Sequence, residues 1–215
     1  MAEPDYSDFV KTYTNPGRPA LVPELVIRLA TELIPLWETT ERIREPGGPP
    51  PYWAFAWPGG QALARYILDN PCIVRGKSVV DFGAGSGLVG IAAAKSGASV
   101  LAADIDPFSL AATSRNAAAN GVVVALTGDD IIGRDGGWDT VCLGDMCYER
   151  PLAERVLPWL HTLTRRGALV LLGDPGRSYF PHSGMRRLAT YGIETSRDLE
   201  DREMRETSVY ELVAG

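Results

Sequence analysis

Residues 77–105 read KSVVDFGAGSGLVGIAAAKSGASVLAADI, and this stretch decides the fold. Two short apolar runs, Ser78–Phe82 and Val100–Ala103, flank an alanine-rich segment. Each run carries an aspartate near or just after its end, Asp81 and Asp104. The turn after the first run holds three glycines, Gly83, Gly85 and Gly87. This order predicts a strand, a tight turn, a helix and a second strand, which form a βαβ unit with a ligand loop at its first turn.

The glycine turn and Asp104 predict a binding site for a nucleoside-type cofactor. Glycines let the backbone approach a ligand closely, and the start of the following helix offers free N–H groups. Asp104 lies about 20 positions beyond the glycines, where an acidic residue holds the ribose hydroxyls in nucleotide-binding folds. A glycine turn that binds no ligand is the alternative interpretation of this loop.

The spacing of the glycines disfavours a dinucleotide. The fingerprint G-x-G-x-x-G would place its third glycine at position 88, which is Leu88. Asp81 stands two residues before Gly83, and its carboxylate would repel a pyrophosphate. The same carboxylate suits the ammonium group of an amino-acid-bearing cofactor such as S-adenosylmethionine.

Composition narrows the class of protein. The chain has 215 residues, 45% of them hydrophobic, so it can bury one substantial core. Its net charge is −6 and its pI is near 5.0. An acidic chain lacks the basic surface that general DNA or RNA binding requires, whereas it tolerates a partner surface that presents lysines. We therefore expect no nucleic-acid partner. We also expect a monomer.

The cysteines and the apolar runs bear on metal binding and location. Cys72, Cys142 and Cys147 form no metal-like cluster and suit a reducing compartment. No apolar run approaches the length of a membrane span, and the acidic, aromatic N-terminus is unlike a signal or transit peptide. We expect no metal site, no membrane association and a cytoplasmic location.

The chain divides into a short N-terminal part and one main domain. Residues 1–48 are expected to form a helical and loop extension, and residues 49–215 the domain. Leucines at helical spacing predict a helix from Pro23 to Pro35. The proline- and glycine-rich stretch Glu45–Pro51 is typical of a rigid linker.

Four aromatic residues lie between positions 52 and 57, just before Gly59-Gly60 and a predicted helix over Gln61–Asp69. One interpretation is that these rings pack the linker onto the sheet. The other is that Trp57, with Gly59-Gly60, covers the open side of the cofactor. For Trp57 the two interpretations are equally supported.

Alternating strands and helices follow the βαβ unit. Helices are expected after Asp106-Pro107, over Leu152–Leu163 and over Ser183–Thr190, and strands over Val122–Leu126, Thr140–Leu143, Ala168–Leu172, Ile193–Leu199 and Ser208–Val213. The charged run Arg197–Glu206 is expected to be a solvated loop. The fold class is therefore α/β, a mostly parallel sheet of Rossmann-like type with an antiparallel hairpin at its edge and helices on both faces.

Aspartates follow the strands, and the carboxyl ends of parallel strands meet at one edge of the sheet. The predicted convergence includes Asp81, Asp104, Asp129, Asp145 and Asp174. In the sequence Thr127-Gly-Asp129-Asp130-Ile131, a carboxylate can accept from an adenine amino group and an apolar residue can pack on the ring. A pair of solvated loop acids or a helix cap is an equally good interpretation for either aspartate.

Asp81-x-Gly83-x-Gly85-x-Gly87 resembles motif I of the seven-strand (class I) methyltransferases. Two further segments narrow the resemblance. The stretch 51–71, PYWAFAWPGGQALARYILDNP, and Gly144-Asp-Met-Cys-Tyr148 are similar to segments of the electron-transfer-flavoprotein β-subunit lysine methyltransferases, as is Gly173-Asp-Pro-Gly-Arg177. The resemblance covers roughly residues 49–177, and Cys147 departs from it where these enzymes often have Phe.

The resemblance implies S-adenosylmethionine as cofactor and a lysine of the flavoprotein β subunit as acceptor. It implies a cofactor site at Asp81, the three glycines and Asp104, with adenine near Asp129 or Asp130 and Ile131 and with Trp57 on the wall. It implies that Asp145 and Tyr148 form the lysine end.

An ammonium has no lone pair, so the acceptor must first lose its proton. Asp145 alone would raise the pKa of the lysine. We therefore expect Asp145 and the Gly144 carbonyl to orient the amine, with desolvation beside Tyr148 and the sulfonium charge favouring loss of the proton.

The residues also allow other functions. The acceptor can be a ribosomal protein lysine, another protein or a small amine. A binding module without activity and a nicotinamide-dependent oxidoreductase are the alternatives from other classes.

Overall fold

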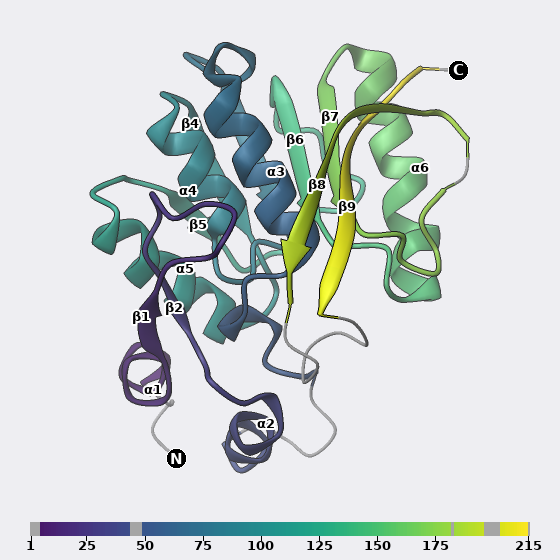
Figure 1. Ribbon diagram of the computed structural model, residues 1–215. Coiled ribbons are helices and arrows are strands. Elements are labelled where there is room, and N and C mark those ends of the chain that lie inside the picture. The colour runs from purple at the N-terminus through teal and green to yellow at the C-terminus, as the bar shows by residue number, and fades with distance from the viewer. Residues whose placement is uncertain (1–4, 44–48, 182, 196–202, 215) are drawn as a thin grey trace.

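A seven-stranded sheet forms the centre of the computed structural model, which describes residues 5–43, 49–181, 183–195 and 203–214 (Figure 1). The strand order is β5-β4-β3-β6-β7-β9-β8. The strands are β3 (Ser78–Phe82), β4 (Ser99–Ala103), β5 (Ala125–Thr127), β6 (Thr140–Gly144), β7 (Leu169–Asp174), β8 (Met185–Glu194) and β9 (Met204–Leu212). The strands β3 to β7 pair in parallel, and β9 pairs antiparallel with both β7 and β8. The predicted fold class is confirmed.

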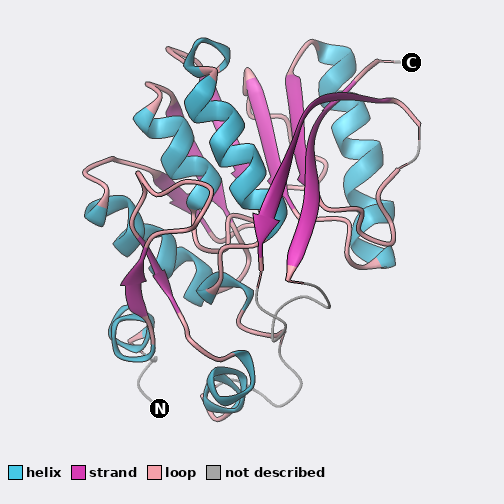
Figure 2. Cartoon of the chain, in the orientation of Figure 1, coloured by secondary structure: helices cyan, strands magenta, loops and turns pink. Residues whose placement is uncertain are grey.

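Helices cover both faces of this sheet because its strands are apolar on both sides. Along β6, Val141 and Leu143 belong to one buried cluster and Cys142 to the other. Helices α3 (Pro58–Asp69) and α4 (Leu88–Lys95) pack on the Cys142 side, and α6 (Arg150–Arg166) on the opposite side (Figures 1 and 2). Such two-sided burial explains why the strands read as continuous apolar runs.

The order in which strands are added to the sheet switches sides at β3, which places a ligand crevice there. From β3 the chain builds outward through β4 and β5, and then returns to add β6 and β7 on the other side. In open α/β sheets the ligand binds at such a switch point, at the carboxyl ends of the strands. The loops after β3, β4 and β6 therefore surround the site.

Helix α5 (Pro107–Ala119) begins and ends where the sequence indicates. The side chain of Asp106 accepts a hydrogen bond from the Phe108 N–H, and Pro107 occupies the first helical position. Asn120 is the C-cap, and Gly121 follows it with a positive φ. The expectation for this segment is confirmed.

The predicted helix from Pro23 to Pro35 is wrong. Residues Ile27–Leu29 form β2, which pairs antiparallel with β1 (Asn15–Gly17), and α2 (Leu33–Glu41) begins near the end of the predicted helix. The backbone N–H groups of Val26 and Arg28 donate to the side chains of Asn120 and Asn116 on α5. These tertiary hydrogen bonds favour extended backbone over the local leucine spacing.

The predicted helix over Ser183–Thr190 is also wrong, because residues 185–194 form β8. The hairpin thus begins earlier than expected. An irregularity in the pairing between Arg187 and Ala189 interrupts the alternation that would have indicated a strand. Residues 204–206 of the predicted charged loop belong to β9, and 196–202 lie outside the described residues, as do 45–48 of the predicted linker.

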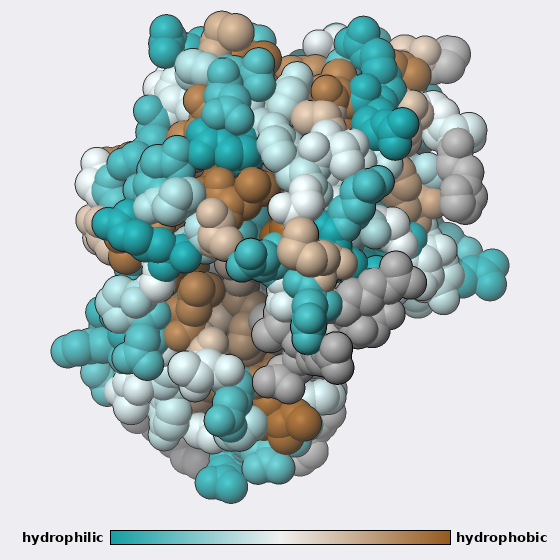
Figure 3. Space-filling model, viewed as in Figure 1, coloured by the Kyte–Doolittle hydropathy of each residue, from teal (hydrophilic) through white to brown (hydrophobic). Residues whose placement is uncertain are grey.

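The N-terminal part contains a helix that the sequence did not predict, α1 (Tyr6–Tyr13), capped by the Asp5 side chain. Its buried residues Phe9 and Val10 pack with Trp53 and Phe108. The space-filling view shows a hollow with hydrophobic residues on its walls, between the sheet-bearing part of the molecule and the lower part that contains α1 and α2 (Figure 3). In the described ranges no helix has both the length and the apolar character needed to cross a bilayer.

Candidate active site

A cavity of about 450 Å³ lies at the carboxyl ends of β3, β4 and β6. Its wall includes most of the predicted site residues: Trp57, Asp81, Gly83, Gly85, Asp104, Asp129, Asp130, Asp145 and Tyr148. Four of the five aspartates expected to converge therefore line one cavity. Asp174 is buried and is not part of the lining.

The glycine turn has backbone angles that favour glycine. Gly83, Gly85 and Gly87 have φ values of 65°, 52° and 77°. A β-carbon at Gly83 would lie 2.3 Å from the Met146 sulfur, and one at Gly87 would lie 2.7 Å from a Thr113 methyl carbon. Gly83 and Gly85 line the cavity, whereas Gly87 is the N-cap of α4. Gly83 and Gly85 thus present backbone to the cavity, and Ala84 and Ser86 of the same turn also line it.

Asp81 and Asp104 brace this turn from two sides. Oδ2 of Asp81 accepts from the Gly90 N–H at 2.7 Å, in the first turn of α4. Oδ2 of Asp104 accepts from the Gly85 N–H at 2.8 Å, and Oδ1 accepts from the Asp106 N–H at 2.9 Å. Burial raises the pKa of Asp81 to about 7 and also raises the pKa of Asp104.

Asp129 and Asp130 lie at the exposed rim of the cavity, each paired with an arginine. Asp129 contacts Arg134 at 2.8 Å, and Asp130 forms an ion pair with Arg155. Ile131 points away from the cavity into the core around Trp138 and Trp159, whereas Ile132 lines the cavity. The structure therefore places Ile132, and not Ile131, where an apolar residue can meet a ligand.

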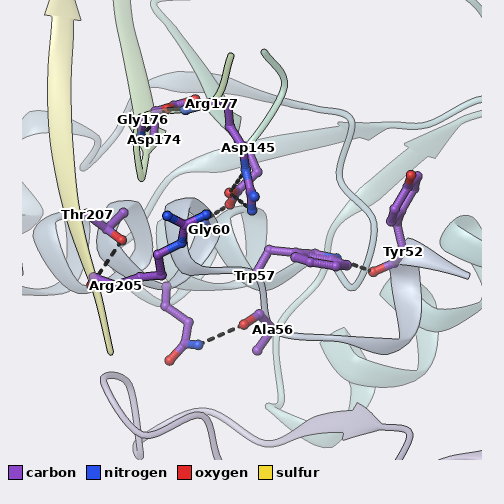
Figure 4. A network of polar contacts seen from close by, with 11 residues as sticks. Tyr52, Ala56, Trp57, Gly60, Asp145, Asp174, Gly176, Arg177, Arg205 and Thr207 are labelled. Carbon is purple, nitrogen blue, oxygen red and sulfur yellow. Dashed lines mark hydrogen bonds and ion pairs between the residues drawn. The ribbon is translucent and has the colours of Figure 1, made fainter. Parts of the chain in front are cut away.

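Tyr52, Phe55 and Trp57 line the cavity, whereas Trp53 belongs to the buried core. Trp53 is fully buried and stacks on Phe108 at 5.7 Å. Trp57 lines the cavity and is the N-cap residue of α3. Its indole N–H donates to the Tyr52 carbonyl at 2.8 Å, which fixes the plane of the ring (Figure 4).

Asp145 has a backbone conformation that residues with a β-carbon seldom adopt. Its φ is 55°, and it is the one non-glycine residue with positive φ in the described part of the chain. Its N–H donates to the Gly173 carbonyl at 3.0 Å, and its Oδ2 accepts from the Gly60 N–H at 3.1 Å. Strain of this kind persists where the surroundings impose it, often at functional sites.

Arg177 reaches the same carboxylate from the loop after β7 (Figure 4). Its Nε and Nη2 donate to Oδ1 of Asp145 at 3.0 and 2.7 Å. Its guanidinium carbon lies 5.8 Å from the centroid of the Trp57 ring. Arg177 was not among the predicted site residues, although it ends the segment Gly173-Asp-Pro-Gly-Arg177 that resembles the family.

Asp174 shapes the turn that carries Arg177. Its Oδ1 accepts from the N–H groups of Gly176 and Arg177, both at 2.7 Å. Burial raises its pKa to about 6, and the charge of nearby Asp145 adds to this effect. Asp174 thus acts on the site through Arg177.

Tyr148 completes the end of the cavity nearest Asp145. Its ring lies 5.3 Å from that of Tyr52, between centroids, and burial raises its pKa to about 12. Cys147 is 2% exposed and does not line the cavity. Its departure from the family pattern therefore lies outside the cavity wall.

Sequence comparison places the chain among known proteins. It is 43% identical to the electron transfer flavoprotein beta subunit lysine methyltransferase of Danio rerio, over 86% of this chain and 73% of that protein. The Xenopus laevis protein of that name is 40% identical over 94% of this chain and 85% of its own length. The chain belongs to this family. The resemblance noted in the sequence is therefore confirmed.

Other sequence matches cover a smaller part of the chain. The family model of ribosomal protein L11 methyltransferase (PrmA) matches residues 62–134. The Vibrio cholerae ribosomal protein L11 methyltransferase is 53% identical over 62 residues, 28% of this chain and 21% of that protein.

Two solved structures share the fold. Magnesium protoporphyrin IX methyltransferase from Synechocystis PCC 6803 with bound S-adenosylmethionine superposes with a TM-score of 0.53 at 17% identity, covering 71% of this chain and 77% of that one. The Thermoplasma acidophilum protein 1320 gives 0.56 at 20% identity, covering 72% and 89%.

Proposed function

We propose that this protein is an S-adenosylmethionine-dependent protein-lysine N-methyltransferase whose substrate is the electron transfer flavoprotein β subunit. The observation that carries the proposal is that one cavity is lined both by glycines of the turn and by Asp145 and Tyr148. Membership of the family supports the choice of substrate.

The residues of the cavity fit S-adenosylmethionine. A volume of about 450 Å³ lies in the range of small-molecule sites, which is roughly 300–1,000 Å³. The positive-φ glycines leave space beside the backbone that side chains would otherwise fill. When bound, the cofactor supplies an electrophilic methyl group on a sulfonium.

We assign the cofactor-binding roles as follows. Asp104 binds the ribose hydroxyls, because an ionised carboxylate has about four acceptor positions, and the N–H groups of Gly85 and Asp106 with the Ser109 side chain use three of them. Asp129 or Asp130 accepts from the adenine amino group, and Ile132 takes the packing role first expected for Ile131. Trp57 covers the cofactor from the side of Tyr52, and Asp81 with the glycines supports the amino-acid end.

We assign the acceptor lysine to the space between Asp145 and Tyr148. A neutral amine placed there can donate an N–H to the carboxylate while its lone pair faces the methyl group. Catalysis then comes mainly from alignment, which is worth several orders of magnitude when reacting atoms are held in contact. The ring pair Tyr52–Tyr148 excludes water from this end.

The proposal includes further expectations about partners. The substrate is a protein, and no nucleic acid or membrane takes part in the reaction, in keeping with the net charge of −6. The enzyme acts as a monomer. Free thiols at Cys72, Cys142 and Cys147 fit a reducing compartment such as the cytoplasm.

Labelled methyl transfer to purified proteins tests this function. The enzyme is incubated with radiolabelled S-adenosylmethionine and either the flavoprotein or ribosomal protein L11, and the proteins are separated on a gel. We expect label in the flavoprotein β subunit. Label in L11 alone would assign the enzyme to a ribosomal substrate, and binding of S-adenosylhomocysteine without any transfer would favour a binding module.

A further inference from the structure

The carboxylate that we assign to the acceptor lysine already has a cationic partner. Two nitrogens of Arg177 donate to Oδ1 of Asp145, and the Gly60 N–H, in the first turn of α3, donates to Oδ2 (Figure 4). The side chains of Arg177 and Asp145 are 17% and 9% exposed, so solvent screens the pair only weakly. Both oxygens of Asp145 thus accept hydrogen bonds from neighbouring donors.

This arrangement addresses the main difficulty of lysine methylation. A lysine amine is protonated at neutral pH, since its ordinary pKa is about 10.4. A lone carboxylate beside it would favour the ammonium and raise that pKa further. A carboxylate that already shares its charge with a guanidinium still accepts an N–H but attracts an ammonium much less.

Other titratable groups face the pair from the neighbouring elements. Asp174 at the end of β7 and Cys147 after β6 are close enough for Asp145 to affect their pKa values. Burial raises the pKa of Tyr52, the charge of Glu149 raises it further, and the charge of Arg177 opposes this. Burial also raises the pKa of Tyr148, and Tyr52, Glu149 and Asp104 add to that effect. Arg205 of β9 is drawn in the same group of polar contacts (Figure 4).

Arg177 makes two direct hydrogen bonds to the carboxylate. Cys147 and Tyr148 have pKa values raised to about 12, so both are neutral in the working range. Arg177 keeps its charge at every usable pH. It is also fixed in place, because Asp174 accepts from its backbone N–H and the Trp57 ring lies under its guanidinium.

We propose that Arg177 is a positioning residue that occupies Oδ1 of Asp145 and thereby favours the neutral, nucleophilic form of the bound acceptor lysine. The inference rests on the function proposed above and adds the reason why the bound lysine loses its proton. The ammonium proton leaves to water before transfer. The amine lone pair then forms the bond to the methyl carbon, and the electron pair of the broken carbon–sulfur bond stays on sulfur.

The dependence of the single-turnover rate on pH, with substrate protein saturating, tests this role. Rates of this kind report groups in the enzyme–substrate complex, whereas kcat/KM reports the free enzyme. Arg177→Gln removes the charge and keeps a hydrogen-bonding side chain. We expect the midpoint of the profile to move up by about 1–3 pH units, the usual effect of one close charge. The rate at neutral pH falls by a corresponding factor of about 10–1,000, and alkaline pH restores it.

Two further variants separate charge from structure. Arg177→Lys keeps the charge but loses the two-pronged contact, so we expect it to restore the midpoint and to recover only part of the maximal rate. Arg186→Gln removes an exposed arginine paired with Glu211 on the β8–β9 hairpin, and we expect a wild-type profile. Melting temperature and S-adenosylhomocysteine affinity of each variant verify that the cavity is intact.

A loss of rate by the same factor at every pH, with the midpoint unchanged, would overturn the inference and leave the proposed function standing. A wild-type rate in Arg177→Gln would do the same. Absence of methyl transfer by the wild-type enzyme at any pH would instead overturn the proposed function, and the inference with it.

Discussion

At the scale of single residues, the site depends on how Asp145 is held. Its positive φ directs the carboxylate towards both the Gly60 N–H and Arg177. Aspartate tolerates this region better than most residues that carry a β-carbon. The conformation thus costs a small amount of stability, and it places one carboxylate between a helix start and a guanidinium.

Asp145→Asn is expected to separate binding from turnover. The amide keeps the shape of the side chain and can still accept from the Gly60 N–H, so the cofactor loop is not disturbed. It places an NH2 or a weaker acceptor against Arg177 and the acceptor amine, and misalignment of this kind costs roughly 100-fold in rate. Calorimetry with S-adenosylhomocysteine and labelled methyl transfer measure the two effects. A variant that keeps its turnover but loses cofactor affinity would show that the assigned role is wrong.

Asp81 is expected to make the stability of the ligand-free protein depend on pH. Burial raises its folded-state pKa to about 7, and the charge of Asp104 adds to this, while the Gly90 N–H opposes it. Its pKa in an unfolded chain is about 3.9, so the native state binds the extra proton between the two values. The stabilisation from this proton is complete below about pH 4 and is lost as the pH rises through about 7.

Asp81→Asn removes this dependence and serves as its test. Thermal unfolding of both proteins from acid to slightly alkaline pH gives the difference in melting temperature, variant minus wild type. We expect this difference to become more positive as the pH rises, because only the wild type loses the stabilisation from the Asp81 proton. Asp174 titrates in a similar range, but it is present in both proteins and its effect cancels in the difference. A difference that is constant over the range would mean that Asp81 keeps an ordinary pKa.

The sequence predicted some site residues better than others, for a physical reason. The glycines and Asp104 lie within one βαβ unit, so their positions relative to the ligand follow from local geometry. Arg177 acts across strands, since its partner Asp145 is 32 residues away in the chain. The choice between Ile131 and Ile132 depends on which of two neighbours faces the core in an irregular loop, which no periodicity reports.

At the scale of elements, helix α3 meets the ends of β6 and β7 through glycines. A β-carbon at Gly59 would lie 2.2 Å from the Gly173 carbonyl oxygen and 2.5 Å from Oδ2 of Asp145. One at Gly144 would lie 2.8 Å from the Gly60 α-carbon. The pair Gly59-Gly60 thus allows the helix start to approach Asp145 and donate to it.

Gly59→Ala is expected to destabilise the protein and displace Asp145. The added methyl group meets backbone that cannot move aside, and overpacking of this kind costs about 1–3 kcal/mol. Gly60→Ala is the matched control, because the nearest atom to its β-carbon would be 4.0 Å away. We expect it to stay within about 1 kcal/mol of wild type, on the stabilising side that helix propensity favours. Denaturant unfolding compares the two, and equal losses would contradict the packing argument.

The elements that the sequence predicted correctly are those buried on both faces or marked by caps. The strands β3, β4, β6 and β7 and the ends of α5 belong to this group. Elements stabilised by edge pairing or by distant side chains were missed or misassigned. Segment 185–194 needs β9 as its partner, and β2 needs the asparagines of α5.

At the scale of the whole molecule, the N-terminal part is joined to the cofactor site through an aromatic cluster. Phe9 of α1 lies 4.9 Å from Phe108 and 6.4 Å from Trp53, between ring centroids. Trp53 in turn lies close to the glycine turn, since a β-carbon added at Gly85 would be 3.8 Å from the Trp53 α-carbon. We propose that residues 1–48 form an extension that supports the glycine turn of a methyltransferase domain spanning residues 49–215.

Phe9→Ala is expected to weaken both stability and cofactor binding. Removal of a buried ring costs about 3–5 kcal/mol, and the loosened Trp53 allows the glycine turn to move. Tyr13→Ala, one turn further along α1, removes a ring that is 46% exposed and should cost less in both respects. Melting temperature and S-adenosylhomocysteine affinity are the measurements. Loss of stability with unchanged affinity would show that the extension does not support the cofactor site.

Mass spectrometry of the flavoprotein β subunit after incubation with enzyme and S-adenosylmethionine tests the central claim most directly. We predict that peptides of the β subunit gain the mass of one or more methyl groups on lysine with the wild-type enzyme, and that Asp145→Asn leaves them nearly unmodified. An unmodified β subunit, from a wild-type enzyme that demonstrably binds S-adenosylhomocysteine, would contradict the claim.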